Sequence, residues 1–380
     1  MRWLVLASSL RSKNGYGVLC GSLVEALGRT GRVELDVVTA DTSGNLSGRG
    51  RAMDRLTGER ITWHPRLWPW YVLRDLITLF RVARGPYDGV LVLVEHFGPA
   101  GWLFARMKGI PCVLTQCGSY AVYFLKDIPF FKTLLQRAAR VLPISRYTRR
   151  RMEEEGVRAR FTVVTLGVDK RKFVHGGEPR QREILFVGNL KARKGFDFLL
   201  DAVALTRKQV PDLRVRVVGA VDLVTPDATP VLERIRREKL PVDFAGPLDD
   251  AELAAAYRRA RINALPSHSD RFFFEGFGLV HLEANACGTL TVGTLNSGNE
   301  DAIGEGFGSL VEYGDVPALS DVLADALLRE PYPDLPLDAL RDWDSVAHDY
   351  ADILEEEAQQ RPLLHSGTSG FHKKHDLKRD

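Results

Sequence analysis

The chain has 380 residues, of which 45% are hydrophobic and 27% are charged, and its formal net charge at pH 7 is +3. This balance is typical of a soluble globular protein, and nothing in it predicts a nucleic-acid partner. Because the length exceeds what one hydrophobic core usually serves, two domains are expected.

The charge is distributed unevenly along the chain. Residues 1–170 contain 26 Lys and Arg against 14 Asp and Glu, whereas residues 171–380 contain 26 against 35. The first half should therefore be attracted to anionic surfaces.

Cysteine usage and hydropathy predict a cytoplasmic protein. The four cysteines show neither Cys-x-x-Cys nor zinc spacing, which favours a reducing compartment over a disulfide framework. The apolar start, Met1–Leu10, is too short for a secretion signal and is expected to be a first strand. No stretch has the roughly 18 apolar residues of a membrane-spanning helix. Contact with the inner face of the cell membrane is expected only through the basic first half.

The first expected unit is a strand, a glycine turn and a helix. Residues Arg2–Ala7 form a continuous apolar run typical of a buried parallel strand, and the helical pattern runs from Val18 to Leu27. Between them lie Gly15 and Gly17, in a corner that suits phosphate. The glycine spacing misses the dinucleotide fingerprint by one residue, so a tight turn without a ligand is the alternative.

Residues 42–60 are polar and glycine-rich and predict a mobile loop, and an aromatic, arginine-rich stretch follows from Trp63 to Arg84. From Trp70 onward one helical face carries Arg74, Thr78 and Arg81, and the opposite face carries Leu73, Leu76, Ile77 and Phe80. Such a helix either lies on an anionic membrane or packs its apolar face into the domain.

Further strands are predicted at Gly89–Val94 and Pro111–Thr115, and two side chains with possible chemistry follow them. His96 comes after the first strand and Cys117 after the second. A lone histidine at a strand end is either structural or part of a ligand site, and both interpretations stay open. Residues Thr162–Asp169 are expected to close the first domain.

The second unit begins with the strand Ile184–Gly188 and continues into the helix Phe196–Leu205. The intervening loop contains Asn189, Arg193 and Lys194. Cations on a loop beside a helix N-terminus suit phosphate, with surface charge as the alternative.

The most informative stretch runs from Glu275 to Glu283, after a strand-like run. Gly276 and Gly278 allow a close approach of the backbone to a ligand, and the following helix N-terminus favours an anion. Glu283 should point back toward the same pocket, where ribose hydroxyls would partner its carboxylate. The alternative is a structural glutamate paired with an arginine.

Near the end, Asp342-Trp343-Asp344 has a metal-binding form, but it precedes an amphipathic helix from Val346 to Leu354 and is explained by helix capping. Residues 361–380 are polar and are expected to form a disordered tail.

Taken together, these motifs resemble a known family. The segments Pro266-Ser267, Glu275–Leu279, Glu283-Ala284 and Ala286–Gly288 are similar to the donor-site signature of retaining glycosyltransferases of family 4, which are related to glycogen synthase. The resemblance implies an α/β GT-B fold, with two Rossmann-like domains facing each other across a cleft. An N-terminal acceptor domain would span 1–168, with 345–360 crossing back onto it, and a C-terminal donor domain would span 169–344.

The resemblance also implies roles for individual residues. Glu283 would hold the ribose of a sugar nucleotide, and Glu275 would face the transferred sugar. Backbone amides of Phe277, Gly278 and Leu279 would hold sugar hydroxyls and diphosphate. The loop of Gly15 and Gly17 would lie opposite, against the diphosphate or the acceptor.

Three positions connect this chain to the family pattern or depart from it. Lys194 matches a family lysine, whereas Asn189 replaces the arginine that usually follows the first glycine, and Arg193 would supply the missing guanidinium. Cys117 replaces a histidine common in the family, for which His96 is the nearby substitute.

The implied reaction is the retaining transfer of a hexose from a UDP- or GDP-sugar to a glycan or lipid-linked acceptor, in envelope polysaccharide or glycolipid biosynthesis. Neither a cofactor nor a metal is expected. A non-catalytic nucleotide-sugar-binding partner subunit is the alternative that Asn189 and Cys117 favour, and a phosphorylase is a weaker one. An NAD-dependent oxidoreductase is disfavoured because neither unit has the glycine fingerprint followed by an acidic residue.

Overall fold

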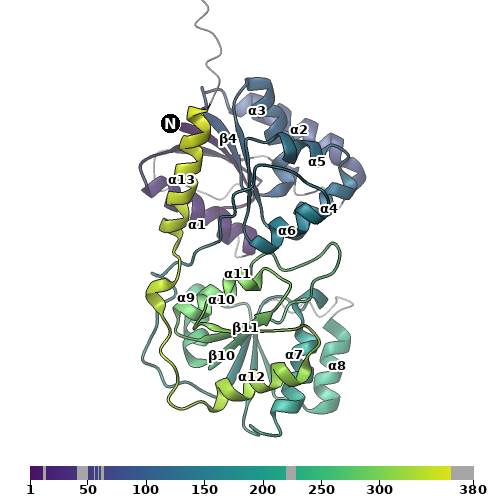
Figure 1. Ribbon diagram of the computed structural model, residues 1–380, viewed down its shortest axis with the longest axis vertical. Helices are drawn as coiled ribbons and strands as arrows, with labels where there is room; N and C mark the ends of the chain where they lie inside the picture. Colours follow the sequence, from purple (N-terminus) through teal and green to yellow (C-terminus); the bar gives the residue numbers. More distant parts are fainter. Residues whose placement is uncertain are drawn as a thin grey trace, which may run out of the picture.

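A computed structural model describes residues 1–11, 14–40, 50–54, 56–58, 60, 64–219 and 228–360. The predicted tail at 361–380 and much of the predicted loop at 42–60 lie outside these residues. Two α/β domains follow one another along the long axis of the molecule, and the last helix returns to the first domain (Figure 1).

The N-terminal sheet has six parallel strands in the order β3-β2-β1-β4-β5-β6. They are β1 (Arg2–Ala7), β2 (Glu34–Thr39), β3 (Gly50–Asp54), β4 (Gly89–Val92), β5 (Cys112–Gln116) and β6 (Arg140–Pro143). The continuous apolar runs correctly predicted central strands covered on both faces. Strand β3 is a correction, because it lies inside the predicted loop 42–60. Within the described part of the chain it is an edge strand that pairs with β2 alone, and such a strand needs no continuous apolar run.

Helices connect these strands. They are α1 (Gly15–Arg29), η2 (Pro65–Leu67), α2 (Trp68–Val82), η3 (Glu95–Phe97), α3 (Gly98–Lys108), α4 (Ser119–Asp127), α5 (Phe131–Arg137) and α6 (Arg146–Glu154). Side chains cap two of them, since Asn14 Oδ1 accepts from the Gly17 N–H and Ser145 Oγ accepts from the Thr148 N–H.

The C-terminal sheet repeats the same topology, with the order β12-β11-β10-β7-β8-β9. Its strands are β7 (Glu183–Val187), β8 (Arg214–Val218), β9 (Val242–Gly246), β10 (Ile262–Ala264), β11 (Leu290–Thr294) and β12 (Gly308–Val311). Numbered within each domain, both sheets have the order 3-2-1-4-5-6 of the Rossmann fold.

The helices of this half are η4 (Ala192–Lys194), α7 (Phe196–Thr206), α8 (Ala228–Glu238), α9 (Asp250–Arg259), α10 (Leu279–Ala286), α11 (Asn299–Ala302), α12 (Val316–Leu328), η5 (Leu337–Ala339) and α13 (Trp343–Gln359). A separate buried cluster fills the C-terminal domain. The cluster of the N-terminal domain continues into Phe274 and Phe277, so the two domains share buried apolar surface.

Helix α2 packs on a different face from the one predicted to be buried. Its buried side chains are Tyr71, Val72, Asp75 and Leu79, whereas Leu73, Ile77 and Phe80 are exposed. Asp75 decides the orientation, because its fully buried carboxylate accepts hydrogen bonds from the N–H and the hydroxyl of Thr57, each at 2.7 Å. The apolar row of the helix is therefore left on the surface.

The chain crosses between the domains twice, and the two crossings are paired. Val168 and Asp342 form an isolated parallel bridge, and Asp342 caps α13 by accepting from the Ser345 N–H. The capping interpretation of Asp342 is thus confirmed. Helix α13 then runs along the N-terminal domain beside α1 (Figure 1). Its buried residues include Val346, Ala347, Tyr350, Ala351 and Leu354.

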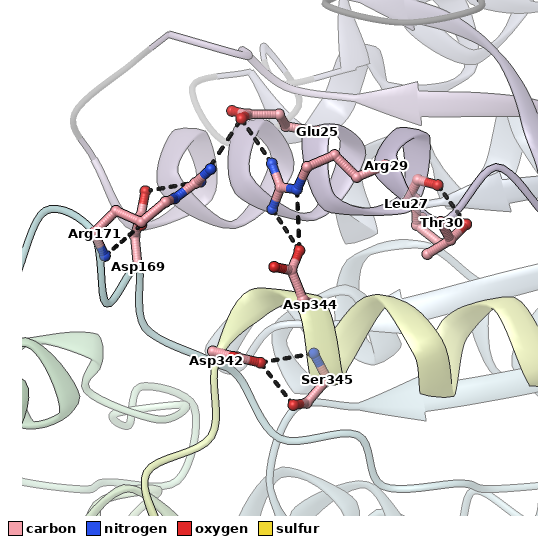
Figure 2. Close-up of polar contacts among 9 residues, drawn as sticks. All are labelled: Glu25, Leu27, Arg29, Thr30, Asp169, Arg171, Asp342, Asp344 and Ser345. Atoms are coloured by element: carbon pink, nitrogen blue, oxygen red, sulfur yellow. Dashed lines mark hydrogen bonds and ion pairs between the residues drawn. The ribbon is translucent and has the colours of Figure 1, made fainter. Parts of the chain in front are cut away.

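Ion pairs join α1 to both crossings (Figure 2). Arg29 donates to Glu25 on the same helix and to Asp344 at the start of α13. Arg171 pairs with Asp169 in the first crossing and lies 3.8 Å from Glu25. Single exposed pairs stabilise a protein little, but this network positions three segments relative to one another.

Gly167 offers a test of how tightly the crossings pack. A Cβ at this position would lie 2.4 Å from the carbonyl carbon and oxygen of Asp342. We expect Gly167→Ala to lower the free energy of unfolding by roughly 1–3 kcal/mol through overpacking, as measured by urea denaturation. Gly177→Ala is the matched control, since nothing lies within 4 Å of its added Cβ. Equal stability of the two variants would contradict close packing of the crossings.

Candidate functional site

The candidate site lies where the strand order reverses in each sheet. In open parallel sheets, ligands bind beyond the carboxyl ends of the two strands that flank this reversal. These strands are β1 and β4 in the N-terminal domain and β7 and β10 in the C-terminal domain. The segments that follow β4, β7 and β10 contain Glu95, the cations Arg193 and Lys194, and Glu275.

Glu275 is at the centre of the site and binds both predicted cations. Its Oε2 accepts a hydrogen bond from Lys194 Nζ at 2.6 Å and from Arg193 Nη1 at 3.0 Å. The residue is only 9% exposed. Burial alone would raise its pKa, but the charges of Lys194 and Arg193 outweigh burial and lower the pKa to about 2. Glu275 is therefore ionised at neutral pH.

The two cations together carry more positive charge than the single carboxylate that they share can balance. Burial lowers the pKa of Lys194, and the charge of Glu275 opposes this effect. The Lys194 side chain is 17% exposed and that of Arg193 is 32% exposed. With both cations protonated, the three groups carry a net charge of one positive unit, and Arg193 still contacts solvent. This charge suits an incoming anion.

Local backbone geometry places the cations beside Glu275. The turn η4 ends at Gly195, which has a φ of +70°. A Cβ there would lie 1.8 Å from the Pro266 carbonyl oxygen. The His268 N–H also donates to the Arg193 carbonyl at 2.7 Å. Glycine therefore lets the cationic loop lie directly on the segment that leads to Glu275.

The glycines after Glu275 make close contacts, partly with the other domain. A Cβ on Gly276 would lie 2.1 Å from the Cys117 carbonyl oxygen. Gly278 has a φ of +93° and immediately precedes Leu279, the first residue of α10. Phe277 is buried, and its carbonyl accepts from Asn299 Nδ2 at 3.3 Å. Close approach was predicted toward a ligand, and for Gly276 the structure adds a close approach to the N-terminal domain.

Glu283 lies on α10 and is partly buried. Its Oε2 accepts from the Tyr257 hydroxyl at 2.9 Å, so its partner is a tyrosine of α9 and not the arginine considered from the sequence. Burial raises its pKa to about 7 despite this hydrogen bond. A carboxylate held in this way would gain from further hydroxyl donors.

On the N-terminal side, sequence reasoning missed Glu95. Its fully buried carboxylate accepts from the backbone N–H groups of Cys117 and Gly118, the latter at 3.1 Å. Burial raises its pKa to about 7. The available signal was a charged residue directly after an apolar strand, at the strand end where ligands bind.

His96 lies in an aromatic cluster and is 5% exposed. Its ring centroid is 4.7 Å from that of Tyr120, 5.2 Å from Phe124 and 5.8 Å from Tyr16. Burial lowers its pKa to about 3, so the imidazole is neutral. Among the described residues its Nδ1 has no hydrogen-bond partner.

The remaining predicted residues are not drawn into the Glu275 cluster. The Gly17 N–H already donates to Asn14 Oδ1 at 2.9 Å, as part of the α1 cap. Gly15 and Asn189 are exposed. The structure thus brings together Arg193, Lys194 and Glu275. Within the described part of the chain, no group of three His, Cys, Asp or Glu side chains could hold a metal ion.

Glu275→Gln tests the charge balance. Its folded-state pKa of about 2 lies below the ordinary value of 4.5, so ionised Glu275 contributes stability that is complete above pH 4.5 and is lost as pH falls through about 2. We expect the free energy of unfolding of the variant to be lower by roughly 3 kcal/mol at pH 7. This value is the lower end of the range for a buried unpaired ion, because Arg193 contacts water. The loss should shrink toward pH 2. Glu178→Gln, which removes an exposed partner of Arg258, should change the melting temperature little at either pH. A pH-independent difference for Glu275→Gln would contradict the ionised cluster.

Two family models match consecutive parts of the chain. "Glycosyl transferase 4-like domain" matches residues 14–167, and "Glycosyl transferases group 1" matches residues 168–338. A D-inositol 3-phosphate glycosyltransferase from Frankia alni is 35% identical over 190 residues, which cover 46% of each chain. One from Corynebacterium glutamicum is 36% identical over 186 residues, covering 44% of this chain and 43% of the relative. The matched segments thus span less than half the length of these curated relatives.

Solved structures agree with the fold over nearly the whole chain. Sucrose-phosphate synthase from Thermosynechococcus elongatus has a TM-score of 0.75 at 20% identity, covering 93% of this chain and 98% of that one. Anabaena HepE in complex with UDP-glucose has a TM-score of 0.67 at 18% identity, covering 94% and 98%. Together with the two family models, which span residues 14–338, these similarities show that the chain belongs to the group 1, family 4 glycosyltransferases and has the GT-B fold.

Proposed function

We propose that the protein is a retaining glycosyltransferase that moves a hexose from a UDP- or GDP-sugar to a glycan or lipid-linked acceptor. The observation that carries this proposal is the Glu275 cluster at the switch point of the C-terminal sheet, with its excess positive charge. Relatives named as D-inositol 3-phosphate glycosyltransferases and the neighbour that holds UDP-glucose support a nucleotide-sugar donor.

The chemistry that this site would perform is separation of charge. Breaking a bond between a sugar and a diphosphate places negative charge on the leaving phosphate, and preorganised donors lower the barrier most when they face that charge. Lys194 and Arg193 would be these donors, together with the amides of Phe277, Gly278 and Leu279. In this proposal they do the work of a metal ion, so the reaction is metal-independent.

Glu275 and Glu283 would orient the donor. Glu275 would accept from hydroxyls of the transferred sugar once the diphosphate draws the cations toward itself, and Glu283 would bind the ribose. Attack from the face that the phosphate leaves, with that phosphate taking the acceptor proton, retains the configuration without a protein nucleophile. The donor domain would then be 169–344. The acceptor domain would be 1–168 with 345–360, and its Gly15–Gly17 turn and His96 would lie on the acceptor side.

Loss of the Lys194 contact with the phosphate, or of the Glu283 contact with the ribose, should lower turnover strongly. We expect Lys194→Ala and Glu283→Ala each to lower turnover at least about a hundredfold, which corresponds to roughly 3 kcal/mol of transition-state stabilisation. Turnover would be measured as release of the nucleoside diphosphate with acceptor present. Lys191→Ala is the matched control, because Lys191 lies exposed on the same loop. Near-normal turnover in both site variants would remove the site assignment.

A donor screen tests the function itself. UDP, GDP, their sugars and NAD would each be added in a thermal-shift assay, and sugar transfer or hydrolysis would then be followed by product analysis. We expect a uridine or guanosine diphosphate to raise the melting temperature, because a ligand that binds only the folded state stabilises it. Stabilisation by NAD would favour an oxidoreductase. Binding of a sugar nucleotide without turnover over many acceptors would favour a partner subunit.

We further propose that α2 contacts an anionic membrane from the cytoplasmic side, where a lipid-linked acceptor or an envelope precursor would be found. The exposed row of α2 includes Trp70 at 62%, Leu73 at 49% and Ile77 at 43% exposure. Arg74 and Arg81 are exposed on the same helix. Exposed apolar side chains next to cations are the chemistry of an interfacial helix. Within the described residues, no helix is both long and apolar enough to cross a bilayer.

Cosedimentation with liposomes that contain anionic lipid tests this contact. We expect a Trp70→Ser/Leu73→Ser/Arg74→Ser variant to lose at least about half of the bound fraction, because it removes both apolar area and charge. Trp68 is left unchanged because it packs on Phe130, with ring centroids 5.2 Å apart. A Met107→Ser variant, which removes an exposed apolar side chain from α3, is the control. Unchanged binding of the α2 variant would discard the membrane contact.

A further inference from the structure

We propose that Glu95 is a positioning residue for sugar transfer. Its carboxylate holds the Cys117–Gly118 turn of the N-terminal domain against the segment Phe274–Leu279, here called the donor loop, and so keeps Glu275 in its working position. This inference rests on the proposed function. Glu95 belongs to the other domain and none of its hydrogen bonds is to Glu275, so any effect of Glu95 on turnover is transmitted through the turn.

The first step is the pair of hydrogen bonds by which Glu95 holds the Cys117–Gly118 turn. One carboxylate oxygen, Oε1, accepts from the N–H groups of both Cys117 and Gly118. The other, Oε2, lies 3.5 Å from the Tyr16 hydroxyl on α1. Two backbone donors on one oxygen fix the direction of both peptide planes. The turn that follows β5 therefore depends on a residue that follows β4.

The second step is the contact between the turn and the donor loop. A Cβ on Gly118 would lie 3.1 Å from Gly276 Cα, and one on Gly276 would lie 2.1 Å from the Cys117 carbonyl oxygen. The two backbones therefore touch without side chains between them. The next residue, Ser119, donates from Oγ to the Phe274 carbonyl at 2.9 Å and accepts from the Phe274 N–H at 2.8 Å.

These contacts hold the residue before Glu275 and the residue after it. Phe274 precedes it and is bound by Ser119, and Gly276 follows it and rests on the turn. A shift of the turn would therefore move the backbone that carries Glu275, and with it the cations that Glu275 binds. Misplacement of a catalytic group by about 1 Å can cost a hundredfold in rate.

The hydrogen bonds from Cys117 and Gly118 depend on the negative charge of Glu95. An ionised carboxylate accepts more strongly than a neutral group. Although burial raises the pKa of Glu95 to about 7, its hydrogen bonds oppose this rise. The ionised form therefore predominates only above neutral pH, and protonation below it weakens the hold on Cys117 and Gly118.

The titratable groups around Glu95 do not titrate in that range. Burial raises the pKa of Tyr16 on α1, of Cys117 in the turn and of Tyr120 on α4, and it lowers the pKa of His96 to about 3. The guanidinium of Arg193 in η4 acts on Tyr16 and Tyr120 from the other domain and lowers their pKa values, against the effect of burial. Glu283, whose pKa is also about 7, lies elsewhere, next to Tyr257.

Glu95→Gln is the informative variant, because the amide keeps the shape and an acceptor oxygen but not the charge. We expect kcat at pH 8 to fall about tenfold while the Kd for the nucleoside diphosphate changes less than twofold. When kcat is plotted against pH, the acid limb of the variant should lack the ionisation of Glu95. The ionisation that remains would be that of Glu283. Because the variant no longer carries a buried charge, its melting temperature at pH 8 should equal or exceed that of the wild type.

A second readout needs no turnover. Hydrogen exchange of the amides from Phe274 to Leu279 should become at least several-fold faster in Glu95→Gln, with the pattern elsewhere unchanged. Glu153→Gln, which removes an exposed ion pair of α6, is the matched control and should alter none of these quantities.

Failure of the proposed role of Glu95 can be distinguished from failure of the proposed function. Sugar transfer by the wild type together with unchanged kcat, pH profile and exchange in Glu95→Gln would overturn the role of Glu95. A fall in kcat matched by a lower melting temperature, with the pH profile intact, would also overturn it, since that result indicates a purely structural residue. Failure of the wild type to transfer any sugar would overturn the proposed function, and the exchange measurement would then decide whether Glu95 holds the donor loop.

Discussion

The contact of Glu275 with Lys194 and Arg193 is the interaction on which the candidate site depends. A single carboxylate oxygen holds two cations that come from the loop after another strand. Burial would make each of these charges costly alone, and pairing removes most of that cost while leaving a positive excess. The loop after β7 and the loop after β10 are thereby fixed to each other at the point where the sheet reverses its strand order.

Close backbone contact explains how this cluster relates to the N-terminal domain. Gly118 and Gly276 meet without side chains, and Ser119 makes two hydrogen bonds to the backbone of Phe274. At a distance from the site, the paired crossings at Val168 and Asp342 and the ion pairs of α1 connect the same two domains. The two domains are thus joined both at the site and at the crossings.

The near-neutral pKa values of the Glu95 and Glu283 carboxyl groups have a common physical basis. Glu95 and Glu283 are both surrounded by few charges of opposite sign, and burial raises the pKa of each to about 7. Glu275 differs because two cations lie within hydrogen-bonding distance, and its pKa falls to about 2. The same residue type therefore has very different pKa values within this protein, and the presence of neighbouring cations decides which value it takes.

Much of this molecule could be predicted from the sequence, because its strands, turns and caps depend on neighbouring residues. Apolar runs such as Arg2–Ala7 indicated parallel strands. The resemblance to a donor-site signature singled out Lys194 and Glu275, and the structure brings these two side chains together. Tertiary packing alone decided which face of α2 is buried, since that choice follows from Asp75 meeting Thr57. It also decided that Glu95 binds a turn 22 residues later and that Gly276 faces the other domain. Such contacts join segments that are distant in the chain, and no local pattern of residues encodes where distant segments meet.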